Sequence, residues 1–286
     1  DGKGCLPDAG DARPRTRPVA GRTSASFLDY RQSGRVRRPR APIPRPGDRI
    51  SGSVRGGVAI KLTIIGCSGS FPGPNSAASC YLVEAPFAGR TFRLLLDLGS
   101  GALGPLQKFV DLREIDAISL SHLHADHCFD MSGLYVVRKY HPTGLQPKLP
   151  VFAPAGSDWQ LSNGYGTTEP NGMTLPFEFR DLSDGLDVTI GPFRFQAKLM
   201  PHPVEAYSVR LTAGGRSLVY SGDTGPKNEL ADFAEGADLF LAEASFVESA
   251  QNPPDLHLTG KDAGQIATAA GVGKLLLTHI PPWTDR

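Results

Sequence analysis

The segment SLSHLHADHCFD, residues 119–130, places His122, His124, Asp126 and His127 where an apolar strand should end and a helix should begin. Alternate side chains of an extended segment lie on one face, so His122 and His124 are expected to point the same way. Asp126 and His127 follow at the turn, where the start of a helix can present a second set of ligands. Imidazole nitrogens and carboxylates are ligands of zinc and similar divalent ions. Histidines that merely serve a turn are the alternative, but this spacing should arise by chance in roughly 3 of 10,000 such chains, so the segment predicts a metal centre.

Four residues cannot saturate two metal ions, and further candidates follow later strands of the sequence. His202 follows FRFQAKLMP, Asp223 follows RSLVYSG, and His279 follows KLLLT. A single histidine after a strand is more often an ordinary core or surface residue. In this order behind the first motif, the three residues together indicate a second group of ligands.

The rest of the pattern predicts a sheet-rich α/β sandwich covered by helices, in one domain. Short β-branched runs bounded by Gly, Ser and Pro read as strands, and a hairpin turns at Gly214-Gly215. Strands are expected within residues 58–70, 79–85, 91–101, 115–122, 148–154, 193–202, 206–224, 237–245 and 274–280. Helices are expected within residues 101–110, 126–140, 228–233 and 260–271.

The net charge of +1 averages two unlike segments. Residues 1–57 hold 13 Lys/Arg against 5 Asp/Glu, whereas residues 58–286 hold 17 against 24. The first segment is rich in Pro and Gly and has only scattered apolar residues, so it is expected to be a disordered basic tail. Either it is a nucleic-acid-binding arm or it is an extension without function. The domain is expected to span residues 58–286.

The composition also limits the surroundings of the protein. No apolar run approaches 18 residues, so a membrane-spanning helix is not expected. The tail lacks the continuous apolar core of a secretory signal. Four cysteines without close pairing form neither a disulfide framework nor a cysteine zinc site. A cytoplasmic location is therefore expected.

Residues 58–286 resemble the metallo-β-lactamase-fold hydrolases, through the motifs SHLHADHC, YSGDTG and LLLTHIPPW. The resemblance implies a four-layer αββα sandwich with two divalent metal ions, zinc first and manganese as the alternative. It implies that one ion is held by His122, His124 and His202, the other by Asp126, His127 and His279, and that Asp223 bridges both. The family continues beyond the seven residues that follow His279 here, so a truncated C-terminus is expected.

Aspartate rather than cysteine at position 223 resembles the phosphodiester-cleaving branches of this family. The positive charge of two divalent ions exceeds the negative charge of the Asp126 and Asp223 carboxylates, which favours an anionic substrate. Asp126 is placed to orient the attacking water or accept its proton. His257 in PPDLHLTG resembles the histidine that assists the leaving oxygen in the ribonuclease Z-like branch, although Leu258 departs from the usual small residue. Glu243 in FLAEASF is its expected partner, since a charge ending so apolar a strand needs one; for both residues a structural role is the alternative.

The substrate is expected to be small. The tRNA-processing ribonucleases carry a long arm between the third and fourth metal motifs, but His202 and Asp223 are only 21 residues apart here, filled by a hairpin. An acidic domain also lacks the basic surface expected for nucleic acid. Together with HPVEAYSVR and PPDLHLTG, the motifs resemble actinobacterial cyclic-nucleotide phosphodiesterases. The resemblance implies hydrolysis of cAMP or cGMP to the 5′-monophosphate, with no membrane partner and a homodimer left open. Ribonuclease Z-like cleavage of tRNA, or hydrolysis of a thioester, lactone or lactam, are the alternatives.

Three further features have less specific interpretations. The glycine-rich residues 66–79 can aim backbone N–H groups at phosphate or simply form a turn. Residues 99–104 can approach the site or start a helix. His141 is interpreted as a surface residue.

Overall fold

The computed structural model describes residues 49–50, 60–169 and 171–284. Most of the predicted tail, residues 1–57, lies outside these residues. Its residues Arg49–Ile50 are described and form strand β1, which pairs antiparallel with β2 (Lys61–Ser68). The first sheet therefore begins inside the segment that was expected to be tail.

The first sheet has eight strands in the order β1-β2-β4-β5-β6-β7-β8, and the short β3 pairs beside β2. Strands β2, β4 and β5 form an antiparallel meander, after which β6, β7 and β8 are added parallel to β5. The bounds of the remaining strands are β3 Ala77–Ala78, β4 Cys80–Phe87, β5 Arg90–Leu96, β6 Ala117–Ser119, β7 Leu149–Ala153 and β8 Phe177–Asp181.

The second sheet repeats this plan with six strands in the order β14-β13-β12-β11-β10-β9. Strands β9 to β12 are antiparallel, and β13 and β14 continue parallel to β12. The β11–β12 hairpin turns at Gly214-Gly215, as the sequence predicts. The bounds are β9 Asp187–Ile190, β10 Phe193–Met200, β11 Ala206–Ala213, β12 Arg216–Tyr220, β13 Leu239–Glu243 and β14 Leu275–Thr278.

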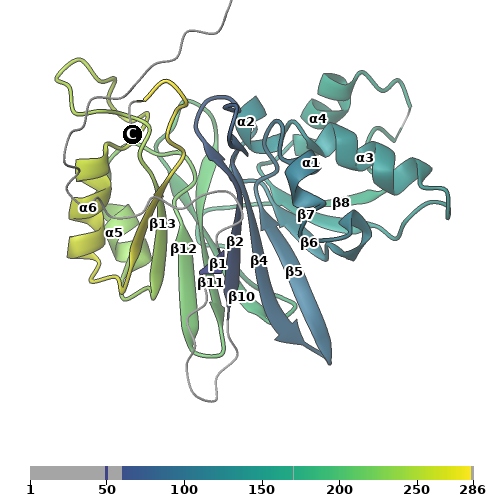
Figure 1. Cartoon of the computed structure of the whole chain (residues 1–286), viewed down its shortest axis with the longest axis horizontal. Helices are drawn as coiled ribbons and strands as arrows, with labels where there is room; N and C mark the ends of the chain where they lie inside the picture. Colours follow the sequence, from purple (N-terminus) through teal and green to yellow (C-terminus); the bar gives the residue numbers. More distant parts are fainter. Residues whose placement is uncertain (1–48, 51–59, 170, 285–286) are drawn as a thin grey trace, which may run out of the picture. The chain divides into compact units, whose positions relative to one another are not determined.

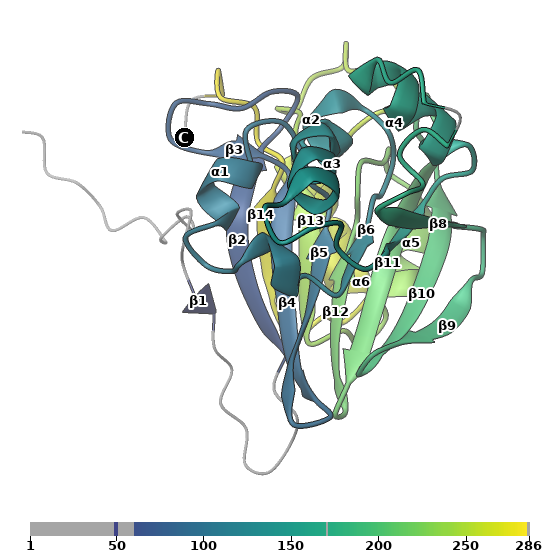
Figure 2. The same cartoon turned by 90° about the vertical axis from the view of Figure 1, so that its right-hand side faces the viewer.

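The helices cover the outer faces of the two sheets (Figures 1 and 2). The first sheet carries α1 (Leu103–Leu106), α2 (Ala125–Cys128), α3 (Met131–Tyr140), α4 (Ser157–Tyr165) and the 3-10 turn η1 (Leu112–Glu114). The second carries α5 (Asn228–Ala234) and α6 (Gly260–Ala269). None of the helices in the described part of the chain is long and apolar enough to cross a membrane.

Three apolar clusters hold these layers together. One lies between the sheets and includes Phe193 and Phe195, and the other two lie between each sheet and its helices. Each fully buried large side chain contributes about 1.5–3 kcal/mol. Helix, sheet, sheet and helix therefore form the αββα sandwich that the sequence predicts.

The differences from the sequence prediction are local. The expected helix over residues 126–140 is two helices, α2 and α3, separated at Phe129 and Asp130. The helix expected within residues 101–110 is confined to α1. Strands β8 and β9 and helix α4 were not predicted. The two strands alternate apolar and polar residues, in FEFRD and DVTI, but are only five and four residues long. The face of α4 is mixed in polarity, so it carries no clear helical pattern.

Strand direction explains where the candidate site lies. In each sheet the parallel strands end at the same edge, which is where open α/β sheets place their ligands. His122 follows β6, Asp223 follows β12, and His279 follows β14. The topology thus gathers residues that are up to 157 positions apart in the sequence, from His122 to His279.

Candidate metal centre

Three histidines converge from the first and second sheets. Nε2 of His122 lies 3.0 Å from Nδ1 of His124, which lies 3.2 Å from Nε2 of His202. Asp223 completes this group, with Oδ2 at 3.7 Å from His122 Nε2. All four ligand atoms lie within 4.8 Å of one another. The alternation of His122 and His124 on one face is therefore as the sequence predicts.

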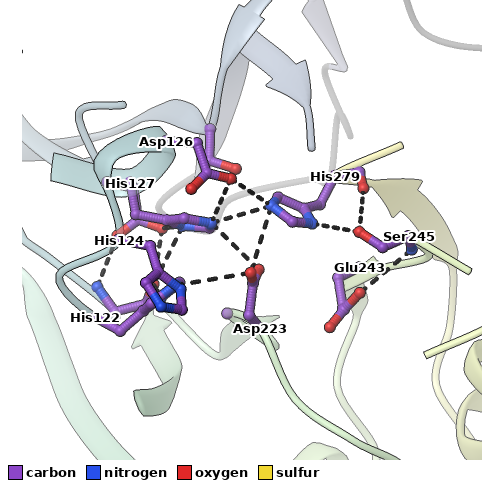
Figure 3. A network of polar contacts seen from close by, with 12 residues as sticks. His122, His124, Asp126, His127, Asp223, Glu243, Ser245 and His279 are labelled. Carbon is purple, nitrogen blue, oxygen red and sulfur yellow. Dashed lines mark hydrogen bonds and ion pairs between the residues drawn. The ribbon is translucent and has the colours of Figure 1, made fainter. Parts of the chain in front are cut away.

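A second group lies beside the first and shares Asp223 (Figure 3). Nε2 of His127 lies 3.1 Å from Nε2 of His279, and both approach Oδ2 of Asp126, at 3.4 and 3.0 Å. Oδ1 of Asp223 is 3.3 Å from His127 Nε2, and its Oδ2 is 3.4 Å from His279 Nε2. Asp223 thus faces both groups. All seven residues that the sequence predicts as ligands are brought together.

In three of these histidines a hydrogen bond from Nδ1–H, on the side of the ring away from the centre, determines where the Nε2 lone pair points. Nδ1–H of His127 donates to Oδ2 of Asp97 at 2.7 Å, and Nδ1–H of His279 donates to Oγ of Ser245 at 2.7 Å. Nδ1–H of His202 donates to the Leu256 carbonyl at 3.0 Å. In these tautomers each Nε2 carries a lone pair that points into the centre.

These contacts fit a cation and do not fit hydrogen bonding alone. The proton that His127 carries in the metal-free protein can serve only one of the acceptors around it, which are Nε2 of His279 and the carboxylates of Asp126 and Asp223. Oδ1 of Asp223 is buried and has no hydrogen-bond partner among the described residues. Two divalent ions, one in each group, would satisfy these atoms.

The three histidines of the first group are neutral in the metal-free protein. Burial lowers the pKa of His202 to about 4 and holds the pKa of His122 well below its usual range. Burial also lowers the pKa of His124. At neutral pH these imidazoles carry free lone pairs, which is the state that binds a metal.

The second group is charged in the metal-free protein. Burial opposes ionisation there, but Asp223 and Asp97 raise the pKa of His127 well above its usual range. Bonding to His127 and His279 holds the pKa of Asp126 well below normal, despite burial. The proton on His127 therefore stands where a bound cation would stand, and metal binding must displace it.

Asp97 and Ser245 were not predicted from the sequence. Asp97 is fully buried and accepts from His127, from the backbone N–H and hydroxyl of Ser121, and from the hydroxyl of Tyr220. The available signal was a lone aspartate between Leu96 and Leu98, since a charge in so apolar a run needs partners. Ser245 carried no such signal.

The backbone around the candidate ligands adopts unusual conformations and makes close contacts. Asp97 and His279 both adopt left-handed conformations, with φ of 58° and 55°. For residues other than glycine this costs about 1–3 kcal/mol, which the surrounding hydrogen bonds must offset. A Cβ atom on Gly99 would lie 1.9 Å from the Asp126 carbonyl oxygen, and one on Gly69 would lie 2.3 Å from that of His279. Both glycines therefore allow loops to pack directly against the centre.

His257 and Glu243 form the predicted pair beside the second group. Nδ1 of His257 lies 3.0 Å from Oε1 of Glu243 and 3.9 Å from Oδ2 of Asp223. Glu243 is fully buried at the end of β13 and also accepts from the backbone N–H groups of Thr224 and Ser245. Burial raises the pKa of Glu243. Burial would lower the pKa of His257, but the bond to Glu243 raises it.

The less specific sequence features lie as follows. Residues 66–79 turn beside His279 through Gly69 and include β3, while a phosphate-binding role remains a prediction. Residues 99–104 both approach Asp126 and enter α1. His141 is half-buried after α3 and bonds within its own turn to Thr143, away from the centre.

Comparison with known proteins agrees with this geometry. A family model described as a beta-lactamase superfamily domain matches residues 92–280. An uncharacterized protein of Mycobacterium leprae, ML1173, is 47% identical over 233 residues, which cover 80% of this chain and 80% of that protein. Ribonuclease Z of Mycolicibacterium gilvum is 30% identical over 252 residues, covering 78% of this chain and 85% of that protein.

A third relative is similar in both sequence and structure. The probable metallo-hydrolase YhfI of Bacillus subtilis is 32% identical over 225 residues, covering 78% of this chain and 87% of that protein. The crystal structure of YhfI, a metallo-beta-lactamase fold protein, matches with a TM-score of 0.69 at 31% identity. That match covers 79% of this chain and 88% of the YhfI chain.

Replacement of Asp223 should weaken both metal sites at once, because its carboxylate faces both groups. We expect the wild-type protein to bind two zinc ions and Asp223→Ala to bind both at least about 100-fold more weakly, beyond the usual effect of losing an outer hydrogen bond. Titration against a chromophoric chelator measures this. His124→Ala should weaken one ion only, and Asp184→Ala, which removes an exposed carboxylate bound to Lys198, should change neither. One ion bound to Asp223→Ala with unchanged affinity would refute the shared role.

The metal-free protein should lose stability as the pH falls from about 6.5 to 4. The folded-state pKa values of His122 and His202 are depressed, so in this window the unfolded chain binds more protons than the folded one. Stability is therefore present above the unfolded pKa and is lost as the pH falls. His202→Asn should flatten this slope, because it removes one such group while Asn can still donate to Leu256. Urea unfolding at several pH values, in the presence of chelator, tests this; an unchanged slope would contradict it.

Proposed function

The chain belongs to the β-lactamase superfamily and has the fold of its metallo-hydrolases, and we propose that it is a phosphodiesterase that hydrolyses 3′,5′-cyclic nucleotides, cAMP or cGMP, to 5′-monophosphates. The proposed cofactors are two divalent ions, zinc first and manganese as the alternative. His122, His124 and His202 would hold one ion; Asp126, His127 and His279 would hold the other; Asp223 would be shared.

The observation that carries the proposal is the pair of ligand groups sharing Asp223, with the His257–Glu243 pair beside it. Two divalent ions exceed the charge of the Asp126 and Asp223 carboxylates, so the filled centre attracts an anion. When bound, such ions polarise phosphoryl oxygens and lower the pKa of a coordinated water from 15.7 to about 7. An anionic phosphodiester is the substrate class that this charge balance favours.

The chain's own residues supply the proton transfers. Asp126 remains ionised and belongs to the second group, so it can orient the attacking water and accept its proton. His257 uses Nδ1 for its bond to Glu243, which leaves Nε2 free for the substrate. The bond to Glu243 raises the pKa of His257 and so favours its protonated form, which can donate to the departing 3′ oxygen as the P–O bond breaks. Glu243 is a positioning residue that holds this ring and compensates its charge.

The surroundings of the centre support a small substrate. His202 and Asp223 are 21 positions apart, and the segment between them consists of a short turn and the β11–β12 hairpin, with no inserted arm. Residues 58–286 are acidic, which disfavours a long polyanion held by its backbone. A cyclic nucleotide presents one phosphodiester charge and needs little further surface. The motifs HPVEAYSVR and PPDLHLTG, which resemble cyclic-nucleotide phosphodiesterases, point the same way.

Ribonuclease Z-like cleavage of tRNA is the second candidate. It is favoured by the 30% identity with ribonuclease Z of Mycolicibacterium gilvum over most of both chains. It requires surface outside the centre to hold a tRNA, which the short connection and the acidic domain do not favour. The two candidates share the same metal centre and differ in the substrate alone.

A substrate panel on one metal-loaded preparation separates these candidates. We expect turnover of cAMP or cGMP with a 5′-monophosphate as product, and little or no 3′-end cleavage of precursor tRNA. Bis(p-nitrophenyl) phosphate serves as a positive control for phosphodiester cleavage by the centre. Chromatography identifies the nucleotide product. Efficient tRNA cleavage without hydrolysis of either cyclic nucleotide would replace the first candidate by the second.

His257→Ala should slow cyclic-nucleotide turnover roughly 10²–10⁴-fold, the usual contribution of a general acid. It should keep both metal ions, because Nδ1 of His257 is bonded to Glu243. His141→Ala is the matched control, since it removes a histidine outside the centre and should leave kcat unchanged. Metal content and kcat are measured on the same samples. Full activity of His257→Ala would assign His257 a structural role only.

A further inference from the structure

Two buried tyrosines, one from each sheet, pack against each other behind the centre. Tyr81 lies on β4 and Tyr220 on β12, and their exposed fractions are 0% and 1%. Their ring centroids are 5.0 Å apart, with the planes inclined at 56°. Both belong to the apolar cluster between the sheets.

Each hydroxyl group crosses to the opposite sheet. Tyr81, from the first sheet, shares a 2.7 Å hydrogen bond with Oγ1 of Thr278, the last residue of β14 in the second sheet. Tyr220, from the second sheet, donates at 2.7 Å to Oδ2 of Asp97, which follows β5 in the first sheet. The two bonds therefore run in opposite directions across one interface.

Both bonds end next to ligands of the same metal site. Thr278 directly precedes His279 in the chain. Asp97 accepts from Nδ1–H of His127 with the same oxygen that Tyr220 contacts. His127 and His279 face each other, with their Nε2 atoms 3.1 Å apart (Figure 3). Each tyrosine thus supports the ligand that the opposite sheet contributes.

A site whose ligands come from two sheets requires that the sheets keep a fixed position relative to each other. Apolar packing between sheets is non-directional, whereas metal–ligand distances tolerate only about 0.2 Å. Directional hydrogen bonds in a dry interior can fix the register that packing leaves loose. The other ligand group depends less on this interface. His122 is linked to it through Ser121, which lies 3.1 Å from His122 Nδ1 and donates to Asp97. His124 comes from the same loop as His122, and His202 is held by the Leu256 carbonyl.

We propose that Tyr81 and Tyr220 form a crossed pair that fixes the two sheets at the Asp126, His127, Asp223 and His279 site and thereby selectively sets its affinity for metal. This inference rests on the metal centre of the proposed function and is independent of the substrate. Neither tyrosine is a proposed ligand or touches the substrate, so both act as positioning residues. Loss of the crossed pair is expected to weaken the binding of one of the two metal ions.

The test uses Tyr81→Phe, Tyr220→Phe and the double variant, in which the rings remain and the cross-sheet bonds are lost. Metal-free protein is titrated with zinc against a chromophoric chelator, and with cobalt while its visible absorption is recorded. We expect one ion to bind as in the wild type and the other to bind 10–100-fold more weakly, with a changed cobalt spectrum. In a His124→Ala background, which impairs the first group, the remaining ion should show the loss directly.

Two further variants serve as a control and as an independent test of the cross-sheet bond. Tyr135→Phe removes the hydroxyl of another buried tyrosine, which accepts from Lys139 outside the centre, and should bind both ions normally. Thr278→Val removes the partner of Tyr81 while leaving the ring packing intact, and should reproduce the loss even if Tyr81→Phe folds poorly. Thermal unfolding of each metal-free variant reports on general stability.

The outcomes distinguish this inference from the metal assignment. Wild-type affinity for both ions in the tyrosine variants, or an equal weakening of both ions with a lower melting temperature, would overturn the crossed pair and leave the centre in place. Fewer than two ions bound by the wild-type protein would overturn the metal assignment itself, and with it the role of the pair. Selective loss of one ion in the tyrosine variants, reproduced by Thr278→Val, would establish the role of the crossed pair.

Discussion

Four carboxylates gather in the interior at one edge of the two sheets, and their mutual repulsion is the constraint on which the surrounding structure depends. Asp97, Asp126, Asp223 and Glu243 are all buried, and none forms an ion pair with a lysine or arginine in the described part of the chain. Buried charges of one sign are costly unless a cation compensates them. Histidines provide part of this compensation in the metal-free protein, through the raised pKa values of His127 and His257. Two divalent ions would replace the proton on His127 and supply the larger part of this compensation.

The fold meets this constraint by dividing the ligands between two similar halves. Each sheet begins as an antiparallel meander and ends in parallel strands, and the parallel strands deliver polar residues to one edge. The first sheet contributes the HxHxDH segment, and the second contributes Asp223 and His279. Left-handed backbone at Asp97 and His279, and close approaches at Gly69 and Gly99, are local costs of bringing these loops together. Neither half holds a complete set of ligands, so the centre depends on how the sheets pack.

The candidate ligands and the proposed catalytic pair are linked by shared contacts. Asp223 faces both ligand groups and lies 3.9 Å from Nδ1 of His257. Ser245 connects the same elements, since its backbone N–H donates to Glu243 and its hydroxyl accepts from His279. The geometry of the two ligand groups and of His257, the proposed general acid, is therefore set by one hydrogen-bonded network. Beyond this network the chain offers a short hairpin and an acidic domain, which is why a small anionic phosphodiester is the substrate we propose.

The sequence by itself determined the residue types and the order of the centre. The HxHxDH spacing, with His202, Asp223 and His279 following later strands in order, named the seven candidate ligands. Family resemblance named the His257–Glu243 pair. The sandwich architecture followed from strand periods and from family resemblance. Strands β8 and β9 escaped prediction because their alternation of apolar and polar residues spans only five and four positions, and helix α4 because its surface is mixed in polarity. Asp97, Ser245 and the two crossing tyrosines could be recognised only in the tertiary structure, because their roles come from partners on other strands: Tyr81 meets Thr278, and Tyr220 meets Asp97, across sequence separations that no local pattern records.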